Sequence, residues 1–211
     1  MDLLGKNENI YNLVHWSNDT EGFHLSAQHP LILQIGVIDQ CVDRAIIRQK
    51  VHAVLLEVLS THFRCAIERV HVKRVAGSAL QCVVRTGDDQ VVQPKISISY
   101  THDLALVAIS LDQSIGLDLL KVDSHFLSQA WQDVAQLYLP PAIAWEIAQL
   151  TQADGALRFA QEWLKLEASF KCAGLALCEY SPAHHHHFSD CRYFPLVLPQ
   201  PYLAVLALKA E

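Results

Sequence analysis

A single acidic residue, Asp118, stands inside an apolar run that covers residues 115–120. An unpaired carboxylate is costly to transfer from water into an apolar interior, so this side chain should have a polar partner. That partner could be a metal ion, an arginine or a set of backbone N–H donors. The residue by itself is compatible with a structural, hydrogen-bonded aspartate as well as with a metal ligand.

A second group of polar side chains lies on the segment 158–173, which has the periodicity of a helix. Residues spaced by four share one face of a helix, and this face carries Phe159, Trp163, Glu167 and Lys171. Glu167 and Lys171 could form an ordinary surface ion pair, worth a few tenths of a kcal/mol. Their aromatic neighbours instead indicate that the charged pair lies at the rim of a buried face.

Basic residues gather in the first half of the chain. Between positions 41 and 80 there are seven Lys or Arg against three Asp or Glu, whereas the formal charge of the whole chain is −6. Arg44, Arg48 and His52 are four residues apart and therefore line one helical stripe. A local basic patch on an acidic protein favours a small anionic ligand or an acidic partner, although a solvated helix face would have the same pattern.

These side chains must be positioned by a mixture of helices and strands. Apolar residues recur with a helical period over 43–63, and the Pro140-Pro141 pair interrupts a second helical region. The pattern predicts helices at 43–63, 128–139, 143–151 and 158–173, strands at 31–37, 96–100, 104–111, 115–120, 175–180 and 203–208, turns at 101–103 and 112–114, and a surface loop at 184–187. This order predicts an α+β fold of two halves, 1–112 and 113–211.

Composition excludes several classes of protein. The net negative charge does not favour nonspecific nucleic-acid binding. No apolar run approaches the roughly 18 residues of a membrane span, and the first residues lack the pattern of a signal peptide, so we expect a cytoplasmic protein with no membrane association. The six cysteines form no close CxxC pair, which indicates reduced thiols rather than a metal cluster. The four consecutive histidines, His184–His187, are assigned no role.

Taken together, the two polar motifs resemble those of the 4′-phosphopantetheinyl transferase family. The family has Ile/Val-Gly-Ile/Val-Asp in a strand, and later Phe-x-x-x-Trp-x-x-Lys-Glu-Ala/Ser-x-x-Lys in a helix. This chain has Ile-Gly-Leu-Asp ending at Asp118, followed 49 residues later by Glu167 within the matching helical motif. A looser resemblance extends over the whole chain, and the length is similar to that of the family's larger, two-half branch.

The resemblance implies a fold and a set of roles. The family has two similar α+β halves, a pseudo-dimer, with coenzyme A in the cleft between them, and a chain of this kind could work as a monomer. Asp118 and Glu167 would hold Mg²⁺ against the pyrophosphate, and Lys171 would contact phosphate. The remaining phosphate contacts would come from Arg44, Arg48, Tyr100 and His102. A serine of an acyl, peptidyl or aryl carrier protein would attack the phosphorus that bears the pantetheine arm, and 3′,5′-ADP would leave.

The chain also departs from the family's pattern. Leu120 stands where many members have a second strand carboxylate, and Leu166 replaces the lysine before the helical glutamate. Tyr100 takes the place of the family's histidine, and Ser78 lies where a lysine is usual. These departures leave two alternatives open: a noncatalytic relative that binds coenzyme A, and a protein-interaction module whose basic helix docks an acidic partner.

Overall fold

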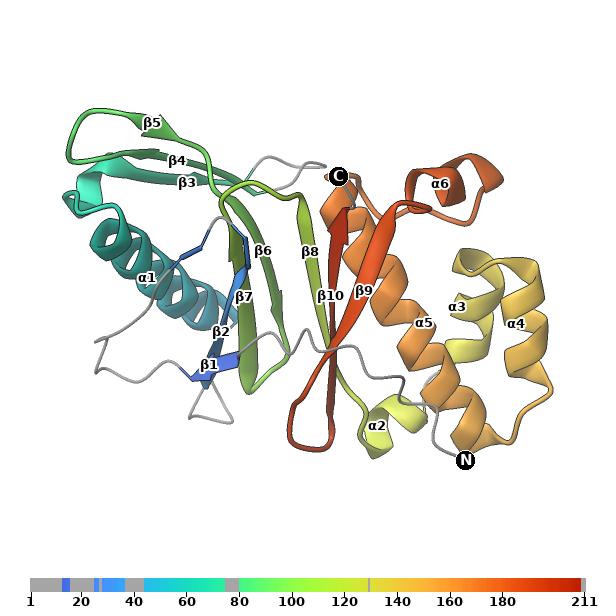
Figure 1. The fold of residues 1–211 in the computed structure, drawn as a ribbon. Helices are drawn as coiled ribbons and strands as arrows, with labels where there is room; N and C mark the ends of the chain where they lie inside the picture. The colour runs from blue at the N-terminus through green and yellow to red at the C-terminus, as the bar shows by residue number, and fades with distance from the viewer. Residues whose placement is uncertain are drawn as a thin grey trace.

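The computed structural model describes residues 13–15, 25–26, 28–36, 44–74, 80–128 and 130–209. The chain has a mixed α+β fold, as the sequence predicts (Figure 1). Its elements in chain order are β1 (Leu13–His15), β2 (Leu31–Gly36), α1 (Arg44–His62), a 3-10 helix (Ile67–Arg69), β3 (Val70–Lys73), β4 (Gln81–Arg85), β5 (Val91–Val92), β6 (Lys95–Tyr100), β7 (Leu104–Ser110), β8 (Ile115–Lys121), α2 (Ser124–Leu127), α3 (Trp131–Tyr138), α4 (Pro141–Ala148), α5 (Gln152–Ala173), α6 (Pro182–His187), β9 (Cys191–Leu196) and β10 (Tyr202–Lys209).

Two sheets form the centre of the molecule, each covered by one long helix (Figure 1). The first sheet has the strand order β1-β2-β7-β6, and α1 packs on it through an apolar core that includes Ile47, Leu55 and Leu59. The second sheet has the order β8-β10-β9 with antiparallel pairing, and α5 packs against β8 and β10. The helices α3 and α4 lie on the far side of α5 from this sheet (Figure 1).

The strand β7 is buried along its whole length because both of its faces are covered. Its odd-numbered residues from Ala105 to Ile109 belong to the core under α1, whereas Leu104, Leu106 and Ala108 pack with Leu117 and Leu206 of the second sheet. The continuous apolar run in the sequence is therefore a strand between two apolar layers, which is what such a run predicts.

Serine side chains connect the two sheets where β6 and β8 run side by side. The hydroxyl of Ser97 accepts a hydrogen bond from the Leu117 N–H at 2.8 Å, and the hydroxyl of Ser99 accepts one from the Leu119 N–H at 3.2 Å. These backbone donors are buried, so a polar partner removes the cost of leaving them unpaired. Because Ser and Ile alternate along β6, the serine side chains lie on the face toward β8 and the isoleucine side chains lie on the face toward α1.

Several sequence-based expectations were wrong. Residues 175–180, predicted as a strand, have no regular secondary structure and follow Gly174, which ends α5 in a left-handed conformation with φ of 68°. The histidine segment 184–187 lies in helix α6 rather than in a loop. The helix predicted from 158 begins at Gln152, because the Thr151 side chain caps it by accepting a hydrogen bond from the Asp154 N–H at 3.2 Å. The strands β3, β4, β5 and β9 were not predicted.

The pseudo-dimer of two similar halves is not confirmed. The predicted boundary at residue 112 falls in the turn between β7 and β8. The chain before it contains a four-stranded sheet and the separate sheet β3-β4-β5, whereas the chain after it contains one three-stranded sheet and five helices. The division at 112 stays a prediction. Within the described part of the chain, no helix combines the length and apolarity needed to cross a membrane.

Candidate functional site

A glycine sets the distance between β8 and α5. A Cβ added at Gly116 would overlap the Ala168 carbonyl oxygen and would lie 2.5 Å from the Cys172 nitrogen, so any side chain here would collide with the backbone of α5. The glycine of the strand motif thus lets helix and strand pack backbone to backbone. Alternate residues of a strand share a face, so Asp118 also points toward α5.

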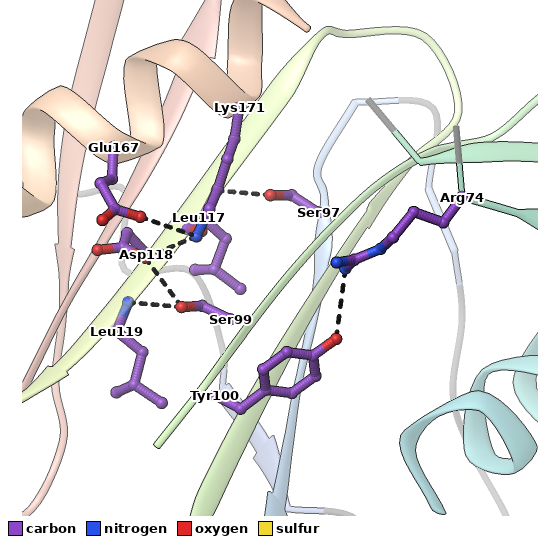
Figure 2. A network of polar contacts seen from close by, with 9 residues as sticks. All are labelled: Arg74, Ser97, Ser99, Tyr100, Leu117, Asp118, Leu119, Glu167 and Lys171. Carbon is purple, nitrogen blue, oxygen red and sulfur yellow. Dashed lines mark hydrogen bonds and ion pairs between the residues drawn. The ribbon is translucent and has the colours of Figure 1, made fainter. Parts of the chain in front are cut away.

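Asp118 is 4% exposed and is held by two side chains from different elements. Its Oδ1 accepts a hydrogen bond from Lys171 Nζ of α5 at 2.6 Å and one from Ser99 Oγ of β6 at 2.9 Å (Figure 2). The sequence left a metal ion, an arginine or backbone donors as partners. In the protein alone the partners are a lysine and a serine.

Lys171 lies between two carboxylates and a carbonyl oxygen. Its Nζ donates to the Leu117 carbonyl oxygen at 3.0 Å, and it lies 3.8 Å from Glu167 Oε2 (Figure 2). The side chains of Lys171 and Glu167 are 30% and 28% exposed, so this end of the cluster is open to solvent. The structure therefore brings together the three residues that the sequence selected: Asp118, Glu167 and Lys171.

The cluster is electrostatically unbalanced. Burial raises the pKa of Glu167 above its ordinary value, the nearby charge of Asp118 raises it further, and Lys171 and the Trp163 side chain offset part of the effect. Two carboxylates face one ammonium group here. A cation arriving at the open end would relieve the repulsion between the carboxylates.

The donor set fits a magnesium ion that is shared with a substrate. Carboxylate oxygens are the protein ligands that Mg²⁺ prefers, and it commonly takes one or two of them together with waters and phosphate oxygens. Asp118 and Glu167 supply two. No group of three or more potential metal-ligating His, Cys, Asp or Glu side chains occurs among the described residues. Two carboxylates are fewer ligands than Mg²⁺ takes, so an ion here would take its remaining ligands from water or from a bound substrate.

A basic cavity of about 230 Å³ opens between α1 and the strands β3 and β6. Arg48, His52, Arg74 and Tyr100 provide its polar groups, and aliphatic side chains form the rest of its wall. A guanidinium nitrogen of Arg74 lies 3.4 Å from the Tyr100 hydroxyl (Figure 2). Tyr100 and its neighbour Ser99 point to opposite sides of β6, so this strand separates the cavity from the Asp118 cluster.

The other predicted contacts are placed differently. His102 is exposed in the turn between β6 and β7 and does not line the basic cavity, and its phosphate contact stays a prediction. Arg44 begins α1, but its side chain lies outside the described residues, as does Ser78. Leu120 packs in the apolar cores around α5. Lys165 forms an ion pair with Glu162 at 2.9 Å, so it does not take the place of the family's lysine at the position of Leu166.

Two site residues escaped the sequence analysis. Ser99 had a signal, because Ser97 and Ser99 alternate with isoleucines in a strand, which places two hydroxyls on one side of it. Arg74 had none beyond its charge: its contact with Tyr100 depends on how β3 meets β6, and the two residues are 26 positions apart.

Comparison with known proteins adds no assignment. The chain matches no protein-family model, and a search of curated proteins finds no significant match.

Proposed function

We propose that this protein transfers 4′-phosphopantetheine from coenzyme A to a serine of an acyl, peptidyl or aryl carrier protein. The observation that carries the proposal is the convergence of Asp118, Glu167 and Lys171, which come from a strand and a helix 49 or more residues apart. The same residues make up the motifs that resemble the phosphopantetheinyl transferases. Gly116 belongs to the motif as well, and its close contact with α5 gives it a physical reason to be there.

The chain's own residues account for the charges that such a reaction handles. When bound between the carboxylates and the pyrophosphate, Mg²⁺ would supply charge neutralisation at the bond that breaks. Lys171 is partly exposed, so its ammonium group can exchange Asp118 for a phosphate oxygen. Asp118 keeps its hydrogen bond from Ser99 in either case, because Ser99 comes from a different element.

Glu167 is the best-placed acceptor for the proton of the attacking serine. In the protein without metal, burial and the neighbouring Asp118 raise its pKa; because a Mg²⁺ ion on the same carboxylate would lower that pKa, this role requires that Glu167 holds the metal through water rather than directly. The serine oxygen forms a bond to the phosphorus that carries the pantetheine arm, the bond from that phosphorus to the nucleotide breaks, and 3′,5′-ADP leaves. Glu167 takes the serine proton as the new bond forms.

The basic cavity is the candidate site for a phosphate group of the nucleotide. Arg48 and Arg74 provide guanidinium groups, which bind phosphate through charge-assisted hydrogen bonds, and Tyr100 adds a hydroxyl. Its aliphatic wall could pack against a ribose or base. Both sites use the strand β6, because Ser99 and Tyr100 are neighbours in it.

One observation favours a second candidate, a relative that binds coenzyme A without turnover. The Lys171–Asp118 ion pair is short, at 2.6 Å, and an ammonium group already satisfies the carboxylate that would hold the metal. Leu120 supplies no further carboxylate on that face of β8. In this candidate the basic cavity keeps its ligand, whereas the Asp118 cluster serves only to join β8 to α5.

Calorimetric titration of Mg²⁺, with and without coenzyme A, separates these candidates. If phosphate oxygens complete the metal site, Mg²⁺ binds weakly to the free protein and more tightly to the complex, and each ligand raises the affinity of the other by the same factor. Coenzyme A binding with no coupling to Mg²⁺ would support the noncatalytic candidate. Absence of coenzyme A binding would remove both and leave a protein-interaction module.

A further inference from the structure

A second cavity, of about 380 Å³, lies on the other side of α5 from the Asp118 cluster. Helices α4, α5 and α6, strand β9 and the link between α3 and α4 contribute to its wall, and Leu166 lines it. Its polar groups include the side chains of Lys165, Ser169, Cys191 and Tyr193. Neither the sequence analysis nor the proposed function gives this cavity a role.

Two cysteines that are 19 positions apart in the sequence pack together, and one of them, Cys191, lines this cavity. Cys172, near the end of α5, and Cys191, at the start of β9, pack in one apolar cluster. The same carbonyl oxygen, that of Ser114, accepts from Cys172 Sγ at 3.2 Å and from the Lys209 N–H at 3.1 Å. Lys209 is the ladder partner of Cys191 in the β9–β10 pair, so the shared Ser114 carbonyl and this ladder bring Cys191 close to Cys172.

The two thiols have unequal environments. Cys172 is 7% exposed, whereas Cys191 is half-buried and lines the cavity. The neighbouring Cys172 thiol, with smaller contributions from Lys209 and Ser169, lowers the pKa of Cys191, and the neighbouring Cys191 together with burial raises the pKa of Cys172. The S–H of Cys172 can turn from the Ser114 carbonyl to the Cys191 sulfur when that sulfur is ionised. Cys191 therefore has the properties of an attacking thiolate, and Cys172 those of a protected second thiol.

We propose that Cys191 and Cys172 form a reversible dithiol–disulfide pair that low-molecular-weight disulfides, such as oxidised glutathione, oxidise from the cavity. The Cys191 thiolate attacks one sulfur of the small disulfide, an S–S bond forms to Cys191, and one thiolate leaves. Cys172 then loses its proton to water and attacks the Cys191 sulfur, which expels the second small thiolate, and the two released thiolates take up protons from water. Two electrons pass from the protein dithiol to the small disulfide, which becomes two thiols.

The bond would join the end of α5 to β9. Cys172 directly follows Lys171, so the oxidised protein would have a covalent constraint next to the lysine that binds Asp118. The pair itself does not depend on the proposed transferase activity, because neither thiol takes part in the proposed reaction.

The test is incubation of the folded, full-length protein with oxidised glutathione, followed by alkylation and peptide mapping by mass spectrometry. We expect the wild-type protein to yield a linked Cys172–Cys191 peptide that disappears on reduction. Cys172→Ser should stop at a glutathione adduct on Cys191, and Cys191→Ser should leave Cys172 reduced. Cys65→Ser, which changes a half-buried thiol elsewhere, is the matched control and should form the linked peptide as the wild type does.

Reaction rates give a measurement that does not depend on any variant folding. In the reduced wild-type protein near neutral pH, iodoacetamide should modify Cys191 several-fold faster than Cys65, because a larger fraction of Cys191 is ionised. The proposal is overturned if no linked peptide forms in the wild type. It is also overturned if glutathione adducts accumulate on Cys191 without passing to Cys172, or if Cys191 reacts no faster than Cys65.

Discussion

Replacement of Gly116 by alanine should separate β8 from α5 and disturb the Asp118 cluster. The added Cβ would lie 2.5 Å from the Cys172 nitrogen and 2.8 Å from the Ala168 carbonyl carbon. The Ala168 carbonyl oxygen would lie closer still, and non-bonded heavy atoms normally approach to about 3.5 Å, so the two backbones must move apart by more than about 1 Å. All of these obstacles are backbone atoms, which cannot rotate away as a side chain could. We therefore expect a loss near the upper end of the usual range for overpacking, about 3 kcal/mol in the free energy of unfolding.

Urea denaturation measures this loss, and Gly36→Ala provides the matched control. Gly36 also lies in a strand, but a Cβ there meets nothing within 4 Å, so its substitution should change stability by less than about 1 kcal/mol. The same displacement would draw Lys171 away from Asp118, so Gly116→Ala should also weaken any coenzyme A binding that depends on Mg²⁺. Equal stabilities for the two variants would refute the view that backbone contact between helix and strand builds the site.

Three further substitutions test the charges of the two sites. Because the pKa of Glu167 is raised from 4.5, the folded protein binds more protons than the unfolded chain between pH 4.5 and the folded-state pKa. The contribution of Glu167 to the free energy of unfolding therefore falls as pH rises through that window. Glu167→Gln should remove this dependence from denaturation curves measured against pH. Leu120→Glu adds a carboxylate on the Asp118 face of β8, so calorimetry should find tighter Mg²⁺ binding in the absence of coenzyme A. An unchanged affinity would show that the metal assignment is wrong. Arg48→Ala and Arg74→Ala should each weaken the binding of coenzyme A by about 1.5–3 kcal/mol. If these arginines contact the 3′-phosphate, the binding of dephospho-coenzyme A should be weakened less. Equal losses for the two ligands would contradict that contact.

The sequence predicted elements whose faces are set by local periodicity. The segment 43–63 became α1 within a residue at each end, and the apolar runs 104–111 and 115–120 became β7 and β8. Prediction failed for the segment after α5, where tertiary contacts rather than local sequence determine whether a strand forms. Residues 175–180 are apolar enough for a strand, but Leu175 and Leu177 are 43% and 41% exposed and no neighbouring strand pairs with them. The strand that pairs with β10 is instead β9, whose sequence Cys-Arg-Tyr-Phe-Pro-Leu has no alternation of apolar and polar residues from which a strand could be predicted.

The candidate site was predictable in its charged residues and not in its contacts. Asp118 stood out because a carboxylate in an apolar strand needs a partner, and the helical spacing placed Glu167 and Lys171 on one stripe. Their meeting depends on Gly116, whose importance comes from the backbone of α5 rather than from any local turn. The hydrogen bond from Ser99 and the position of Arg74 arise from the packing of separate strands, which spacing along the chain does not encode.

The most direct test of the proposed function is the mass of a carrier protein after incubation with this protein, coenzyme A and Mg²⁺. We predict that an apo carrier protein gains the mass of one phosphopantetheine group on its serine, and that 3′,5′-ADP appears in equal amount. Asp118→Ala should abolish the gain while the variant remains folded, because Lys171 can move to Glu167, which already lies 3.8 Å away. If no carrier protein gains mass at any Mg²⁺ concentration, although the wild-type protein is folded and binds coenzyme A, the proposed transfer reaction is wrong.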